Sequence, residues 1–146
     1  MSWHDALWGY EHQMIGWSGI VELAKDRLCC ELDQLIVELS QLRKSEAWKV
    51  AELLHSLVST EHEQSEIISI KKWLFLNLYW LFENKEKIED PLGGVEKIYA
   101  DFNYPHEIED FVRYMPVSGD YDPAEYTINE NINRLFYKWR IYLDLT

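Results

Sequence analysis

The sequence predicts an all-α protein, a single compact domain over residues 1–146 with about six or seven helices. No glycine or proline occurs between Ile20 and Asp90, and such a stretch favours helices joined by polar turns. Leucines recur within it at steps of four and three residues, the spacing that lines one face of a helix. We find no apolar–polar alternation longer than four residues, so no strand is expected. Stacked antiparallel helical pairs are one architecture that fits this pattern.

Three helices are expected in the first part of the chain. The first begins at an N-cap, Ser18, ends near Arg43 and carries a leucine stripe: Leu28, Leu32, Leu35, Leu39 and Leu42. The second runs from Glu46 to Val58, and the third from about Glu66 to Phe82. Because the second half of the third helix is apolar on nearly all sides, we expect it at the centre of the core, with five residues buried: Trp73, Leu74, Leu76, Leu78 and Leu81.

Two Asp-Pro pairs mark helix starts in the second part of the chain. Asp90-Pro91 and Asp122-Pro123 each combine a capping side chain with a proline suited to the first helical turn. After the second pair, Glu125 completes a capping-box pattern, and a long helix is expected to follow. Between the pairs, residues 105–114 predict a short helix with Ile108 and Phe111 facing inward.

The chain is strongly acidic, with 26 Asp and Glu against 14 Lys and Arg, a formal charge of -12 and a pI near 4.7. This charge disfavours nucleic acid and anionic membranes as partners and favours a basic protein. The most apolar run, residues 73–82, is far shorter than the roughly 20 residues that span a bilayer. The two cysteines, Cys29 and Cys30, are adjacent, which argues against a structural disulfide and for a reducing cytoplasm. Both are expected in the core.

Motifs for catalysis are weak. Glu52 and His55 form Glu-x-x-His, which is half of the motif that binds two metal ions in carboxylate bundles, and the chain has no second copy. We therefore expect no catalytic residues, no metal site and no cofactor, and a surface pair at Glu52 and His55.

The strongest signal is a distribution of charge and aromatic rings. Residues 101–130 hold eight acids and one base, Arg113, together with six aromatic side chains. Protein interfaces commonly set aromatic anchors inside a polar rim. We expect partner-binding residues here: Tyr104, Glu107, Glu109, Asp110, Tyr114, Asp120, Tyr121 and Asp122.

The segment from Asp90 to Pro116, together with Lys72-Trp73-Leu74 and an opening with Trp3, Asp5, Leu7, Trp8 and Gly9, resembles a family of small uncharacterised bacterial proteins, a domain of unknown function. The resemblance implies a single-domain, cytosolic, helical protein. It also implies a function, since small acidic proteins of this sort are often the immunity partners of secreted bacterial toxins. It carries over no catalytic residue.

These observations favour a non-enzymatic, acidic protein-binding domain, most concretely an immunity protein that neutralises a basic bacterial toxin such as a nuclease. Two alternatives stay open: a metal-dependent enzyme that uses Glu52 and His55, and a scaffold or regulatory adaptor with an acidic groove. The sequence does not indicate the oligomeric state.

Overall fold

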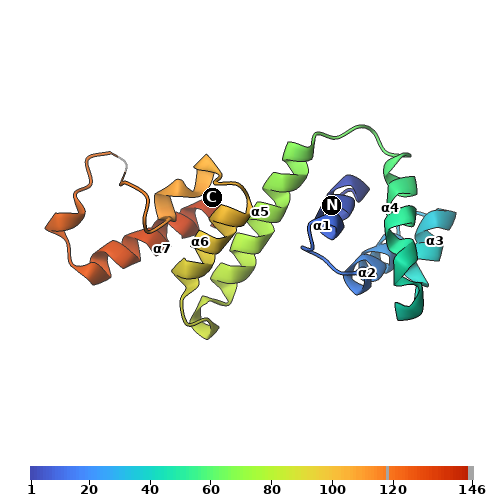
Figure 1. Cartoon of the computed structure of the whole chain (residues 1–146), viewed down its shortest axis with the longest axis horizontal. Coiled ribbons are helices and arrows are strands. Elements are labelled where there is room, and N and C mark those ends of the chain that lie inside the picture. The colour runs from blue at the N-terminus through green and yellow to red at the C-terminus, as the bar shows by residue number, and fades with distance from the viewer. Residues whose placement is uncertain (118, 145–146) are drawn as a thin grey trace. The chain divides into compact units, whose positions relative to one another are not determined.

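The computed structural model describes residues 1–117 and 119–144, and every regular element within those residues is a helix (Figure 1). The all-α class is therefore confirmed, with seven α-helices and four short 3-10 helices in the described residues. They are α1 (Trp3–Glu11), α2 (Trp17–Arg27), α3 (Gln34–Ser40), η1 (Lys44–Lys49), α4 (Val50–Val58), α5 (Glu66–Glu83), η2 (Lys85–Lys87), α6 (Pro91–Asp101), η3 (His106–Phe111), η4 (Pro123–Glu125) and α7 (Ile128–Asp144).

The helices form two compact units, an N-terminal unit (Met1–Trp73) and a C-terminal unit (Leu74–Thr146). One domain over the whole chain stays a prediction. Helix α5 crosses the boundary, so its first eight residues belong to the N-terminal unit and the others to the C-terminal unit.

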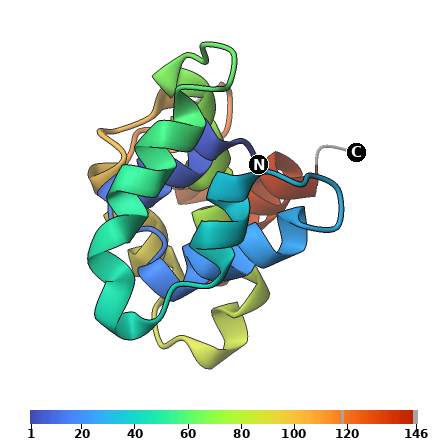
Figure 2. The same ribbon diagram turned by 90° about the vertical axis from the view of Figure 1, so that its right-hand side faces the viewer.

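In the N-terminal unit, α2 packs against α3, and α4 packs against both α1 and α3 (Figures 1 and 2). The apolar faces of these helices meet in a core that includes Ile20, Ile36, Leu39, Leu54 and Leu57, each almost completely buried. Burial of these side chains is the main term that stabilises the unit.

The predicted first helix is interrupted. Helix α2 ends at Arg27, and α3 begins at Gln34 after Asp33, whose side chain accepts a hydrogen bond from the Leu35 N–H at 2.8 Å. The N-cap of α2 is Gly16 and not Ser18. At the break Leu32 is 92% exposed, and of the five leucines only Leu35 and Leu39 lie within a helix, α3.

The break also changes the environment of the cysteines. Cys29 and Cys30 lie in the turn after α2, and both are exposed. The prediction that they are core residues was wrong, because the helix that would have carried them inward ends before them.

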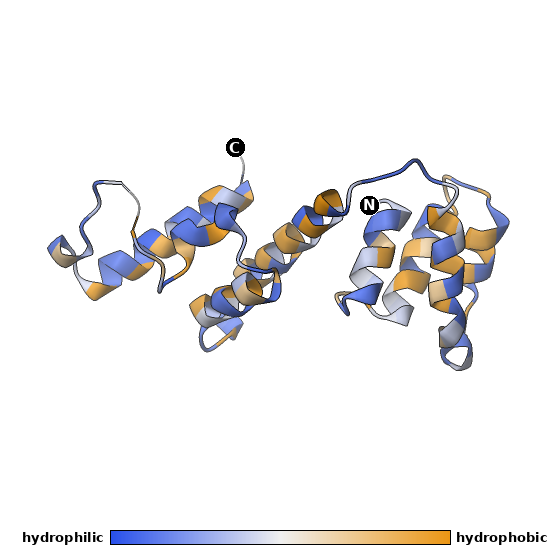
Figure 3. Cartoon of the chain, turned by 45° about the horizontal axis from the view of Figure 1, so that its top comes forward, coloured by the Kyte–Doolittle hydropathy of each residue, from blue (hydrophilic) through white to orange (hydrophobic). Residues whose placement is uncertain are grey.

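Helix α5 has nearly the predicted bounds, but only part of its second half is buried. Leu74, Leu78 and Leu81 are buried as expected, and so is Trp73. Leu76 is 41% exposed, which corrects its expected burial, and its helical neighbours Tyr79 and Trp80 are exposed as well. Hydrophobic residues recur along α5 (Figure 3). In its second half, packing within the C-terminal unit buries only some of them and leaves Leu76, Tyr79 and Trp80 exposed.

The C-terminal unit is built on α5, α6, η3 and α7. Gly94 of α6 faces Leu81 of α5, and a Cβ atom at this glycine would lie 2.8 Å from Leu81 Cδ2, so the glycine permits the close approach. Trp139 of α7 is fully buried between Phe82, at 5.1 Å between ring centroids, and Phe111, at 6.1 Å. The indole therefore joins α5, η3 and α7 in one aromatic core.

The two Asp-Pro signals have different outcomes. Asp90 caps α6 as predicted, since its side chain accepts a hydrogen bond from the Gly93 N–H at 3.1 Å. Asp122 accepts from the Ala124 N–H, but only the 3-10 turn η4 follows it. The long helix begins six residues later, at Ile128.

Thr127 and Glu130 provide the reciprocal capping of α7. The Thr127 N–H donates to Glu130 Oε1 at 3.0 Å, and the Glu130 N–H donates to Thr127 Oγ1 at 3.1 Å. This is a capping box, and it lies five residues after the one that the sequence predicted at Asp122 and Glu125. The short helix expected at residues 105–114 is the 3-10 helix η3, and Ile108 and Phe111 face inward as predicted.

One buried carboxylate organises the polar contacts of the N-terminal unit. Asp5 on α1 is fully buried, and its Oδ1 accepts hydrogen bonds from Gln64 Nε2 and Ser69 Oγ, both at 2.7 Å. Its Oδ2 accepts from Lys72 Nζ at 2.7 Å and from the Ser2 N–H at 2.9 Å. Four donors therefore hold a single carboxylate, which compensates the cost of burying its charge.

Side chains from other segments also hydrogen-bond to the backbone around Asp5. Trp73 Nε1 donates to the Asp5 carbonyl oxygen at 2.8 Å. Glu61 accepts from the Trp3 and His4 N–H groups, at 2.9 and 3.0 Å, which satisfies donors in the first turn of α1. Helix α1 is thus anchored to the polar segment before α5 and to the first turns of α5 itself.

We expect Asp5→Asn to lower the free energy of unfolding by about 2 to 3 kcal/mol at pH 7, because Lys72 then faces a neutral amide and a donor loses its acceptor. Burial raises the pKa of Asp5, but the hydrogen bonds from Lys72, Ser2, Ser69 and Gln64 outweigh it, so the pKa lies well below its ordinary range. In the unfolded chain the carboxyl has a pKa of about 3.9 and takes up a proton at higher pH than the folded one does.

The wild-type protein should therefore lose this stability as the pH falls through and below about 4, and the gap to Asp5→Asn should narrow. Urea denaturation at pH 7 and at pH 3 measures the gap. Asp26→Asn, at an exposed position on α2, is the matched control and should be nearly neutral at both pH values. An Asp5→Asn gap that stays constant with pH would contradict the role given to the carboxylate.

Candidate partner-binding surface

The eight residues expected to bind a partner all lie in the C-terminal unit, in two groups. The first group follows α6 and continues through η3: Tyr104, Glu107, Glu109, Asp110 and Tyr114. The second group precedes η4: Asp120, Tyr121 and Asp122. Glu109 and Tyr121 are half-buried, and the other six are exposed.

The end of α6 determines where Tyr104 lies. The Tyr104 N–H donates to the Tyr99 carbonyl at 2.7 Å, and the Asn103 N–H donates to the Ala100 carbonyl at 3.1 Å, which is a Schellman ending. Asn103 and Tyr104 have φ of 60° and 59°, in the left-handed region that bulky residues rarely adopt. The chain reverses sharply at this point and brings the Tyr104 ring back onto α6.

Tyr104 and Tyr114 flank a third tyrosine, Tyr99 on α6. The Tyr104 ring meets Tyr99 edge to face at 5.2 Å between centroids, and Tyr114 lies 6.1 Å from Tyr99. Tyr99 is buried, whereas Tyr104 and Tyr114 are each 58% exposed. We call Tyr99, Tyr104 and Tyr114 the tyrosine cluster. Sequence reasoning missed Tyr99 because it lies two residues before the acidic window.

Glu109 links this cluster to η3. Its Oε1 accepts a hydrogen bond from the Tyr99 hydroxyl at 3.1 Å, and its Oε2 lies 2.9 Å from His106 Nδ1. Burial, together with the hydrogen bond to Glu109 and its negative charge, raises the pKa of Tyr99, so this hydroxyl stays protonated and remains a donor. Glu109 therefore supports the tyrosine cluster as well as adding charge to it.

Arg113, the one base of residues 101–130, is engaged with α6. Its two terminal nitrogens contact the Asp90 carboxylate at 3.1 Å each, and its Nε contacts Glu96 at 2.6 Å. The hydrogen bond to Glu96, together with those to Asp90, raises the pKa of Arg113 further above its ordinary value. The guanidinium therefore pairs with acids of α6 and its cap, whereas Glu109 of η3 pairs with His106.

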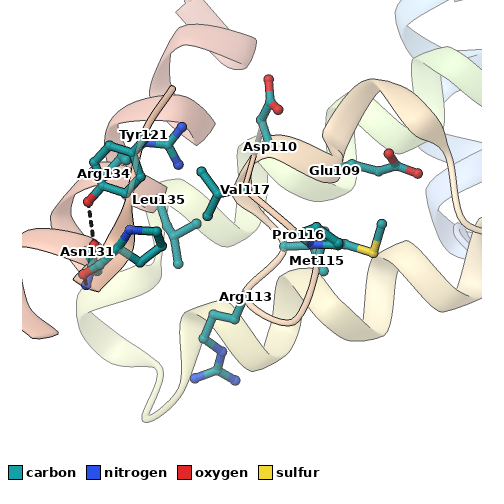
Figure 4. Close-up of a pocket in the computed structure, with 12 residues that line it drawn as sticks. Glu109, Asp110, Arg113, Met115, Pro116, Val117, Tyr121, Asn131, Arg134 and Leu135 are labelled. Carbon is teal, nitrogen blue, oxygen red and sulfur yellow. Dashed lines mark hydrogen bonds between the residues drawn. The ribbon is translucent and has the colours of Figure 1, made fainter. Parts of the chain in front are cut away.

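Tyr121 is built into the structure. Its ring stacks on Tyr126 at 4.7 Å, the Arg134 guanidinium lies 4.1 Å from its centroid, and its hydroxyl is hydrogen-bonded to the Asn131 side chain. Figure 4 shows Tyr121, Arg134 and Asn131 together on one side of a pocket. With three contacts to its own chain, Tyr121 is a weaker candidate for a partner anchor than Tyr104 or Tyr114.

The pocket itself has a volume of about 140 Å³. It brings Glu109 and Asp110 of the first group together with Tyr121 of the second (Figure 4). The other lining residues are Val112, Arg113, Met115, Pro116, Val117, Pro123, Asn131, Arg134 and Leu135. The other five expected residues do not line it, so the structure joins only part of the expected set in this cavity: Tyr104, Glu107, Tyr114, Asp120 and Asp122 lie outside its lining.

Glu52 and His55 are both exposed on α4. Within residues 1–117 and 119–144, no three or more His, Cys, Asp or Glu side chains are grouped so that they could hold a metal ion.

The described residues thus form a small all-α protein, with exposed tyrosines and acidic residues on its C-terminal unit. The chain belongs to the family of uncharacterized proteins conserved in bacteria designated DUF2247, whose model matches residues 1–146. This confirms the family resemblance. No curated protein and no solved structure matches the chain. Among the helices described, none has the length and apolar character needed to cross a membrane.

The left-handed backbone at Tyr104 leads to a stability prediction. Tyr104→Gly and Tyr104→Ala both remove the ring, but only glycine adopts a positive φ without a steric cost. We expect the glycine variant to be more stable than the alanine variant by about 1 kcal/mol, measured by urea denaturation. Equal stabilities would mean that residue 104 does not hold this conformation in solution.

Proposed function

We propose that this chain is a non-enzymatic binding protein of the bacterial cytoplasm that neutralises a basic protein toxin, such as a nuclease, as its immunity partner. One observation carries the proposal. Two tyrosines that are more than half exposed, Tyr104 and Tyr114, pack on Tyr99, whose hydroxyl donates to Glu109 of η3, while the one base of residues 101–130 pairs with Asp90 and Glu96.

The charge of this surface favours a basic partner. An excess of carboxylates attracts a positive protein over distances of roughly 10 Å at physiological salt, and such steering raises association rates. A toxin that cleaves nucleic acid needs a positive cleft to hold its substrate, and this cleft is the surface that an acidic protein approaches fastest.

The exposed rings favour a tight complex. Tyrosine is enriched among the residues that dominate interface energetics, because it buries a large rigid area and keeps a polar tip. Tyr104 and Tyr114 are fixed against Tyr99, so little conformational entropy is lost when a partner covers them. A cationic side chain of the partner can also lie over an exposed tyrosine face.

Rescue of growth tests the function directly. Proteins captured from the native cell by the tagged chain are identified by mass and expressed alone in a host. The proposal expects a basic protein that stops growth, and recovery of growth when this chain is expressed with it. A captured partner that is acidic or harmless to the host would contradict the proposal.

Charge reversal should slow association with that partner. We expect Glu107→Lys combined with Asp110→Lys to lower the association rate and to flatten its dependence on salt, because both carboxylates are exposed and act before contact. Glu109 stays unchanged in this variant, since it supports Tyr99. Surface plasmon resonance at several salt concentrations measures the rates.

The matched control carries Glu52→Lys and Glu63→Lys, two exposed acids of the N-terminal unit, so that the net charge changes equally. The control should keep most of the salt dependence. If both variants slow association alike, only the net charge matters and the η3 surface is not the docking face.

Truncating an anchor should act on dissociation instead. Tyr104→Ala is expected to weaken binding by about 2 kcal/mol, which is roughly a 30-fold faster dissociation rate. Tyr104→Phe keeps the ring and should stay close to wild type. An unchanged dissociation rate for a folded Tyr104→Ala variant would place the anchor elsewhere.

A further inference from the structure

The turn after α2 carries two thiols side by side. Cys29 and Cys30 are both exposed, and their sulfur atoms lie 3.2 Å apart. The Cys29 thiol also lies 2.9 Å from the Asp26 carbonyl, which accepts its hydrogen. The backbone is closed by hydrogen bonds from the Cys30 and Glu31 N–H groups to the Arg27 carbonyl, at 3.0 and 2.9 Å. Two sulfurs are therefore presented to solvent on one side of an ordered turn.

The separation of the sulfurs restricts what they can bind together. A disulfide requires about 2.05 Å between the sulfurs, and closing the pair that far would distort a turn in which the two residues share one peptide unit. A metal ion that prefers two thiolates in a linear arrangement needs the two sulfurs on opposite sides of it. The sulfurs of Cys29 and Cys30 lie 3.2 Å apart in one turn and do not reach such positions. Zinc prefers four ligands, and no third His, Cys, Asp or Glu is grouped with the thiols in the described residues.

A pyramidal trivalent atom can bind both sulfurs at their observed separation. Trivalent arsenic binds two sulfurs on the same side, with a bent S–As–S angle that leaves the sulfurs near van der Waals contact. It is a soft, thiophilic element that needs only these two protein ligands, since a carbon or oxygen substituent completes its coordination.

We propose that Cys29 and Cys30 form a dithiol site that captures trivalent arsenicals of the type R–As=O. In the reaction both S–H bonds break and two As–S bonds form. The two protons leave with the arsenical oxygen as one molecule of water, and arsenic remains trivalent, so no oxidant or reductant is consumed. This site lies in the N-terminal unit and does not depend on the proposed function of the C-terminal unit.

The state of the thiols agrees with this reaction. The hydrogen bond and the electrostatic interaction with Cys30 raise the pKa of the Cys29 thiol, so Cys29 is protonated at neutral pH and supplies one of the protons that leave as water. Because the chain contains only these two cysteines, no other thiol competes for the arsenical.

Phenylarsine oxide is the probe that tests the site. The reduced full chain is mixed with one equivalent of it and followed by intact mass and thiol titration. We expect one phenylarsenic group per chain and the loss of both free thiols. The adduct should resist excess glutathione and be removed by 2,3-dimercaptopropanol, because a second bond to the same chain slows release on the order of 100-fold.

Cys29→Ser and Cys30→Ser are the matched controls, since each leaves one thiol on an exposed turn. Circular dichroism checks that both remain folded. Each single variant should release the arsenical to glutathione rapidly. The proposal is overturned if the wild-type adduct is released as fast as the single-variant adducts, or if one arsenic joins two chains.

Discussion

The N-terminal unit depends on one buried carboxylate. Asp5 has no solvent exposure, so its charge is tolerated only because four donors surround it, and those donors come from the cap of α1, the segment before α5 and α5 itself. The position of α1 relative to these segments is therefore specified by directional polar contacts as well as by apolar packing. Neither Gln64 nor Ser69 could move far without leaving a buried acceptor unsatisfied.

A second carboxylate has a comparable role in the C-terminal unit. Glu109 accepts a hydrogen bond from Tyr99 and contacts His106, which connects α6 to η3 beneath the exposed rings of Tyr104 and Tyr114. An acid of the negative surface thus also positions the aromatic part of that surface. Carboxylates and exposed rings are combined in one short segment, because the Schellman turn after α6 folds Tyr104 back over Tyr99.

Much of the helical structure could be predicted because its signals are local. Asp90 and Pro91 act on the N–H groups of the next turn, and α6 begins where they predict. The same signal at Asp122 yields only a 3-10 turn, since Thr127 and Glu130 provide a better capping arrangement five residues later. The leucine stripe failed at Leu32 for a related reason. Spacing reports which residues would share a face if the helix were continuous, and it does not report that Asp33 caps a new helix.

The sequence by itself determined the all-α class, the bounds of α5 to within one residue, the acidic composition and the segment in which tyrosines accompany carboxylates. Tertiary structure decided which apolar faces are buried, so that Leu78 is enclosed and Leu76 is exposed. It also decided that Tyr121 is held by its own chain, that Tyr99 supports the tyrosine cluster, and that the two cysteines face solvent. Capping and spacing signals depend on residues within one or two helical turns. Side-chain burial and contacts between distant residues depend on segments that meet only after the chain has folded.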